Sequence, residues 1–141
     1  MSQSFIKYKH LENLLSERIQ NLYYEQLKHE IDEITYHLFD NTLIITIEGA
    51  LTPPEQFLNA NEHKKLAKQV REVIDRLIKP QIESSIEEIM NVEVVDFLCD
   101  TTIDTSRTGA IAILGLKPKD PPPKNGDRSP NDTIQLRSNV G

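Results

Sequence analysis

The apolar residues of this chain change their spacing near residue 31, and that change constrains the fold more than any other feature. Over residues 4–29 they recur every three or four positions, which is typical of an amphipathic helix. Over residues 34–38 and 43–47 they alternate with polar residues, as in a strand with one buried face. The turn-favouring pair Asp40 and Asn41 separates these two runs. The pattern predicts one helix followed by an antiparallel hairpin.

A second helix start follows the hairpin. Thr52 is suited to cap a helix, Pro53 to occupy its first position, and Glu55 to complete a capping box. In such a box the carboxylate of Glu55 returns to the amide of Thr52, while the Thr52 hydroxyl accepts from the Glu55 amide. We therefore expect a short helix that begins at residue 53 and ends near residues 59–61.

A longer helix and two more strands are predicted beyond it. Apolar spacing extends the helix to residue 90, with a kink at Pro80, because proline lacks an amide proton and clashes with the preceding turn. Asn91 is a suitable left-handed cap for its end. Strands are expected at residues 92–99 and 110–114, and the polar segment between them is interpreted as a turn rather than a binding loop.

The element order predicts an α+β fold, αββαββ, in one domain spanning residues 1–116. We expect a two-layer sandwich in which helices pack on a four-stranded antiparallel sheet. In the third strand, Val95 and Phe97 are expected on one face, and Val94 and Leu98 on the other. Because both faces of the sheet then carry apolar side chains, and two helices cannot easily cover both, we also expect a homodimer.

Composition restricts the surroundings and partners of the chain. Residues 117–141 hold five of the eight prolines and few apolar residues, which predicts a disordered tail. The net charge of −6 makes nucleic acid an improbable partner, because such binding depends on Lys and Arg. No apolar run is long enough to cross a membrane, and the first residues lack a signal peptide, so we expect a cytoplasmic protein without a transmembrane segment.

Residues with reactive side chains are present, but not in catalytic patterns. The single cysteine, Cys99, lies in a predominantly apolar strand, where cysteine usually serves as a small hydrophobe, although a nucleophile is an alternative. The four histidines lack the spacing of a metal site. Asp96 either faces water or meets a cation such as Arg71. We therefore predict no enzyme, no metal and no cofactor.

Several segments together resemble the MpsC-like domain family, over residues 11–116. They are LTPPE at 51–55, KQVR at 68–71, NVEVVDFLCD at 91–100 and AIAIL at 110–114. The family is named for a component of a bacterial sodium-translocating, membrane-potential-generating system linked to inorganic-carbon supply. One segment departs from it: members tend to have a Gly-x-Gly-Pro stretch where this chain has QLKHE at 26–30. Any role of that stretch in relatives therefore does not transfer here.

The resemblance implies a small domain of poorly defined biochemistry, found alone or attached to signalling modules. The first hypothesis is a non-enzymatic accessory or regulatory domain that binds a protein partner of a sodium or inorganic-carbon transport system. The alternative is a small-ligand sensor with a pocket between the long helix and the sheet. The candidate binding residues for a partner or a ligand are Thr52, Glu55, Arg71, Asp96 and Asp100.

Overall fold

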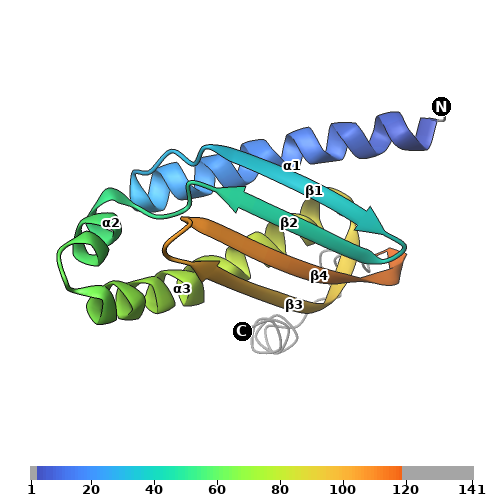
Figure 1. Cartoon of the computed structure of the whole chain (residues 1–141). Coiled ribbons are helices and arrows are strands. Elements are labelled where there is room, and N and C mark those ends of the chain that lie inside the picture. Colours follow the sequence, from blue (N-terminus) through green and yellow to red (C-terminus); the bar gives the residue numbers. More distant parts are fainter. Residues whose placement is uncertain (1–2, 119–141) are drawn as a thin grey trace, which may run out of the picture.

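Two β-hairpins share one antiparallel sheet, with helices on one side of it (Figure 1). The computed structural model describes residues 3–118, with side chains for residues 8–115. The elements are α1 Gln3–Leu27, β1 Glu33–Phe39, β2 Thr42–Glu48, α2 Pro53–Ala60, α3 Lys64–Met90, β3 Val92–Thr102 and β4 Arg107–Pro118. The strand order is β1-β2-β4-β3 in a 4-stranded sheet. The predicted α+β fold is confirmed, while the predicted tail lies outside the described residues except for its first two.

The core lies between the inner face of the sheet and the helices α1 and α3. Leu43, Ile45 and Ile47 alternate along β2 and are fully buried, as the period of a strand requires. On the neighbouring strand β4, the inward positions include the small residues Ala110 and Ala112, which let the helices approach closely. Other buried members of this core are Leu15, Ile19, Tyr23, Ile31, Ile78, Ile82, Ile86, Val94, Phe97 and Leu114.

The helix boundaries follow the local signals in the sequence. Thr52 has extended backbone angles and caps α2, with Pro53 in the first helical turn. α3 continues through Pro80 and ends at Asn91, whose φ of 53° and ψ of 46° place it in the left-handed region, as predicted. A short turn connects α2 to α3 and reverses the chain, so that the two helices are in contact.

The second hairpin is longer than predicted. β3 continues to Thr102 and β4 begins at Arg107, because Thr101 pairs with Thr108 and Thr102 with Arg107. Only the residues between them form a tight turn, closed by a hydrogen bond from the Ser106 amide to the carbonyl of residue 103. These added pairs contain threonines, so the alternation of apolar residues does not extend to the ends of the strands.

An irregularity in β3 corrects the predicted assignment of its faces. The pairing with β4 shifts between Val94 and Asp96, which is the signature of a β-bulge. Val94 and Phe97 are therefore both buried, whereas Val95 and Leu98 are both exposed. The buried Glu87 of α3 accepts a hydrogen bond from the Val94 amide at 2.9 Å. Strict alternation was the wrong assumption here, since one extra residue reverses the side to which each later residue points.

Candidate functional site

The capping box at the start of α2 is the first part of a buried polar network. The Thr52 amide donates to Glu55 Oε2 at 3.0 Å, which confirms the predicted return of the carboxylate to the cap. The Thr52 hydroxyl donates to the same oxygen at 2.7 Å. Glu55 is thus held against the helix start, although it lies in the interior of the protein.

Arg71 from α3 completes the charge balance of this carboxylate. Its Nε donates to Glu55 Oε1 at 2.7 Å and its Nη2 to Oε2 at 2.8 Å, so that the pair is bidentate. The same Nη2 also donates to the carbonyl of Ala50 at 3.0 Å. The Arg71 and Glu55 side chains are only 3% and 1% exposed, which makes this pair a buried one. A charge in such a place is tolerated only with a full set of partners, and both groups have one.

The network extends from α3 to the sheet. Arg71 Nη1 donates to Asp75 Oδ1 at 3.2 Å, and the Thr101 hydroxyl donates to that same oxygen at 3.1 Å. Thr101 in turn shares a hydrogen bond of 2.6 Å with Thr108 across the β3–β4 ladder. Burial raises the pKa of Asp75, and the neighbouring Arg71 offsets this only in part. The chain of contacts therefore links α2, α3 and both strands of the second hairpin.

This network has a structural role, since it holds α2, α3 and the second hairpin together. Glu55 accepts four hydrogen bonds, which are those from Thr52 and Arg71, so its carboxylate is fully engaged. Both charged side chains are almost sealed from solvent, and a substrate has no direct route to them. Two of the segments that carry the family resemblance, LTPPE at 51–55 and KQVR at 68–71, thus supply the side chains that fix α2 against α3.

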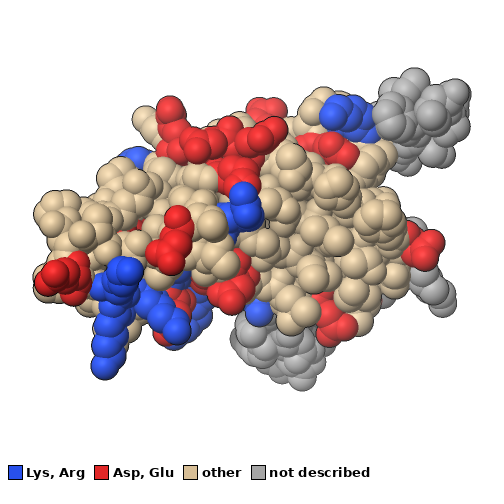
Figure 2. Space-filling view, viewed as in Figure 1, with Lys and Arg blue, Asp and Glu red and all other residues tan. Residues whose placement is uncertain are grey.

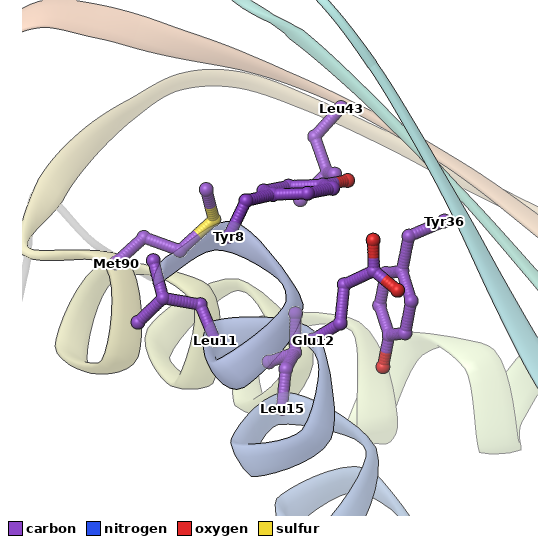
Figure 3. Close-up of a pocket in the computed structure, with 7 residues that line it drawn as sticks. All are labelled: Tyr8, Leu11, Glu12, Leu15, Tyr36, Leu43 and Met90. Atoms are coloured by element: carbon purple, nitrogen blue, oxygen red, sulfur yellow. The ribbon is translucent and has the colours of Figure 1, made fainter. Parts of the chain in front are cut away.

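A small cavity lies elsewhere, between α1 and the first hairpin. Figure 3 shows side chains from α1 pointing toward Tyr36 of β1 and Leu43 of β2, with Met90 closing one side. The cavity has a volume of about 10 Å³, which is the space of a single water molecule. Burial and the nearby carboxylate of Glu12 raise the pKa of Tyr8, which lines the cavity, to about 12. This space is too small for a metabolite.

An open trough of about 370 Å³ runs between α1 and α3 on the surface. Arg18 and Glu88 form an ion pair of 2.7 Å across it, and Leu22 and Pro80 contribute apolar surface. None of the five candidate residues from the sequence lines either hollow. The pocket expected between the long helix and the sheet at Thr52 and Arg71 is filled by the ion pair itself.

The structure divides the five candidate residues into two groups. Thr52, Glu55 and Arg71 share the buried network, whereas Asp96 and Asp100 of β3 are exposed. Arg71 does not pair with Asp96, because its donors are directed to Glu55 and to Asp75 one turn along the same helix. Of the two alternatives for Asp96, exposure to water is the one observed.

The remaining reactive groups show no catalytic arrangement in the described part of the chain. The Cys99 side chain is half-buried, and burial raises the pKa of its thiol to about 12. His29 bonds through Nε2 to the carbonyl of Gly49 at 2.6 Å, at the edge of the first hairpin. Residues 3–118 contain no cluster of His, Cys, Asp and Glu able to hold a metal ion.

An exposed apolar stripe on α3 was missed by the sequence analysis. Leu66, Val70, Val73 and Leu77 follow one another at intervals of four, three and four residues, so they lie on one side of the helix. Leu77 is 61% exposed, and Leu66 and Val73 are also exposed. Next to it along the sequence lie Ala67, Arg71, Ile74 and Ile78, of which all but the partly buried Ile74 are buried. The sequence did contain a signal for this surface: α3 has two apolar stripes side by side, whereas packing against one side of the protein needs only one.

The outer face of the sheet is a second exposed surface, on which apolar and charged residues lie side by side. We define it by the outward residues of the central strands, flanked by those of the edge strands. They are Thr42, Ile44, Thr46 and Glu48 of β2, Arg107, Gly109, Ile111 and Ile113 of β4, Glu33, Thr35, His37 and Phe39 of β1, and Asp96, Leu98, Asp100 and Thr102 of β3. Figure 2 views this side of the molecule, and uncharged residues cover most of it. No described helix covers this face.

Comparison with protein families identifies a match over most of the described chain. The model of the family described as Na+-translocating membrane potential-generating system (MpsC) matches residues 7–115. The chain belongs to the MpsC family. No curated protein and no solved structure matches it. The match runs from α1 to near the end of β4, so it includes the buried network and both exposed surfaces.

The MpsC assignment confirms the resemblance noted from the sequence, and it connects the chain to a sodium-translocating system. Among the described helices of this MpsC chain, none combines the length and the apolar character of a membrane span. Both exposed surfaces of this MpsC chain, on α3 and on the sheet, carry large apolar side chains in contact with solvent.

Proposed function

We propose that this MpsC-family chain is a non-enzymatic accessory or regulatory component that acts by binding a protein partner of a sodium or inorganic-carbon transport system, on its cytoplasmic side. The observation that carries the proposal is the stripe of Leu66, Val70, Val73 and Leu77 on α3. Such residues usually pack into a core or against another helix, and exposed apolar surface of this kind marks interaction sites. The family description supplies the sodium-linked setting.

The spacing of the stripe fits an amphipathic helix as its partner. Intervals of four, three and four residues repeat the pattern by which one helix presents a seam to another. Arg76 borders this seam and forms no ion pair among the described residues. An apolar helix with a carboxylate beside its seam therefore complements this surface best.

The buried network supports a binding role rather than turnover. Its bidentate ion pair between Arg71 and Glu55 is closed to solvent, and the Cys99 thiol is held in its protonated form by burial. The rigid attachment of α2 to α3 fixes the N-terminal half of α3, which carries the stripe. A surface that is ordered before binding loses less entropy when the partner docks.

The test uses a deletion of the gene in the native host, with complementation by the full chain. We expect the deletion to reduce sodium-dependent membrane potential, and the wild-type chain to restore it and to co-purify with a membrane protein of the same system. Leu77→Asp should lower recovery of that protein by at least about tenfold, because a charge in an apolar seam costs more than 1.4 kcal/mol. A matched control is Leu14→Asp on α1, where the leucine is 41% exposed and lies outside the stripe.

Two results would contradict the proposal. The first is a deletion strain with an unchanged sodium-dependent potential. The second is full complementation and unchanged co-purification by Leu77→Asp. Circular dichroism and the melting temperature of both purified variants establish that each is folded, since either leucine is replaced at an exposed position.

A further inference from the structure

The outer face of the sheet has a pattern that a second copy of the same chain would complement. In its two central strands, side chains of the same kind or of opposite charge lie directly opposite each other: Ile44 pairs with Ile111, and Glu48 pairs with Arg107. Leu98 adds an exposed side chain that is 62% accessible. A single patch of this kind is buried most simply by an identical patch, in an isologous interface.

We propose that a second copy of this chain covers the outer face, with the two sheets packed face to face about a twofold axis parallel to the strands. The axis lies between the two sheets, below the boundary of β2 and β4. This operation places β2 of one copy over β4 of the other without moving either along the strand direction. Each residue of β2 therefore meets the residue of β4 to which it is already registered within its own chain.

The central apolar pair is self-complementary under this operation. Ile44 of one copy lies over Ile111 of the second copy, and Ile111 over Ile44 of the second copy, so that four isoleucines meet around the axis. At the edges, β1 lies over β3 of the second copy. His37 then lies above Leu98 and between Asp96 and Asp100 of the second copy.

The charged pair selects this orientation. Within the chain, Arg107 Nε donates to Glu48 Oε1 at 2.8 Å and to Oε2 at 2.7 Å. The proposed axis places Glu48 over Arg107 of the second copy, so charges alternate around a square of four groups. An axis across the strands would instead place this pair over Thr42 and Ile113, which offer no opposite charge. Complementary charge fixes the orientation of an interface in this way.

Gly109 provides an independent observation. It lies on the outer face in a central strand, between Thr46 and Asp100, and a Cβ built there meets nothing within 4 Å. Glycine weakens a strand, and its presence inside one often marks the close approach of another backbone. Among the described residues, none lies close enough to this position to require a glycine. The proposed interface requires one, because Gly109 lies over Thr46 of the second copy, near the axis.

The size of the face sets the expected affinity. Four strands about 4.8 Å apart, with outward residues over about 20 Å of their length, cover about 400 Å² per copy, which is the size of a weak, transient contact. We therefore expect a dimer with a dissociation constant in the micromolar range, visible by analytical ultracentrifugation of the full chain between about 1 and 500 μM. A full chain that stays monomeric over this range overturns the proposal.

Two leucines of equal exposure provide a matched comparison. Leu98 on the outer face is 62% exposed and Leu77 on α3 is 61% exposed, so an aspartate at either position has a similar effect on the isolated fold. We expect Leu98→Asp to raise the dissociation constant by at least about 100-fold, and Leu77→Asp to leave it unchanged. The reverse result assigns the contact to α3 and overturns the proposal.

Charge reversal tests the orientation. Glu48→Arg and Arg107→Glu each place like charges together in the proposed square, and each should weaken the dimer by about tenfold or more. The double variant restores the alternation and should return the dissociation constant to within about threefold of wild type. Failure of the double variant to recover, while its melting temperature matches wild type, overturns the parallel axis. These measurements use purified protein, so their outcome is separate from that of the transport experiment.

Discussion

Arg71 on α3 and Glu55 on α2 form a buried ion pair in which two guanidinium nitrogens meet the two carboxylate oxygens at 2.7 and 2.8 Å. The carboxylate belongs to the capping box of one helix, and the guanidinium also reaches the carbonyl of Ala50, in the segment before that helix. A single side chain of α3 thus holds both the start of α2 and the end of the first hairpin. The ion pair therefore joins α3 to the segment that connects the first hairpin to α2.

Removal of either member should destabilise the protein strongly. We expect Arg71→Met and Glu55→Leu each to lower the free energy of unfolding by about 3 to 5 kcal/mol, because each leaves a buried charge without its bidentate partner. The double variant should lose less than the sum of the two, since both charges are then absent. Urea denaturation measures all three. Strict additivity of the single effects would contradict direct coupling.

Local signals explain why the capping box was predictable while its ionic partner was not. Thr52 and Glu55 are three residues apart, and their hydrogen bonds depend only on the backbone of one helix turn. Arg71 reaches Glu55 from 16 residues away, after a turn and another helix, so the contact depends on how α2 and α3 pack. From residue types, Asp96 was the carboxylate named as a partner for Arg71, with exposure to water as the alternative. The packing of α2 against α3 therefore determines which carboxylate pairs with Arg71.

The errors on exposed surfaces have a similar origin. The period of β3 predicts its faces only while its pairing is regular, and the bulge between Val94 and Asp96 depends on contacts with α3. Along α3, Leu77 and Ile78 are equally apolar in the sequence, yet only Ile78 is buried. The two residues are adjacent, so their side chains point about 100° apart around the helix, and only one of these directions faces the core. The order and type of the helices and strands follow from local sequence, whereas the burial of a given side chain depends on how distant elements pack against it.

Asp75 should make the stability depend on pH. Its pKa is raised by burial, so the folded state keeps this proton at a pH where the unfolded chain has released it. The contribution of this group to stability is therefore greatest below about pH 4 and declines as the pH rises through the folded-state pKa. Asp75→Asn keeps an oxygen that can accept from Arg71 and Thr101 without a buried charge.

We expect Asp75→Asn to be at least as stable as wild type at pH 7, with the difference vanishing toward pH 4. Urea denaturation at a series of pH values between these limits gives the comparison. Asp104→Asn, in the exposed turn of the second hairpin, controls for the loss of one negative charge. A variant that is clearly less stable at pH 7 and equal at pH 4 would show that attraction by Arg71 outweighs burial.

Cys99 should react slowly with thiol reagents. With a pKa of about 12, the thiolate fraction at pH 8 is about a thousandfold below that of a free cysteine. We expect labelling of the folded chain to be slower by about that factor, and to reach the normal rate in urea. The rate is followed by absorbance with a chromogenic disulfide. Fast labelling of the folded protein would instead indicate an activated thiol and revive a catalytic role.

Glu87 should control the bulge of β3 and, through it, the outer face. Its Oε2 accepts from the Val94 amide at 2.9 Å, which satisfies a buried donor that the shifted ladder leaves without its usual strand partner. We expect Glu87→Ala to lower the free energy of unfolding by about 1 to 3 kcal/mol, because this amide then lacks an acceptor. Glu87→Gln retains an oxygen acceptor at the same position and should lose less. Amide hydrogen exchange at Val94 reads the contact directly: protection should fall in the alanine variant and persist in the glutamine variant. Equal protection in both variants would show that another group satisfies the Val94 amide and that the bulge is fixed by strand pairing alone.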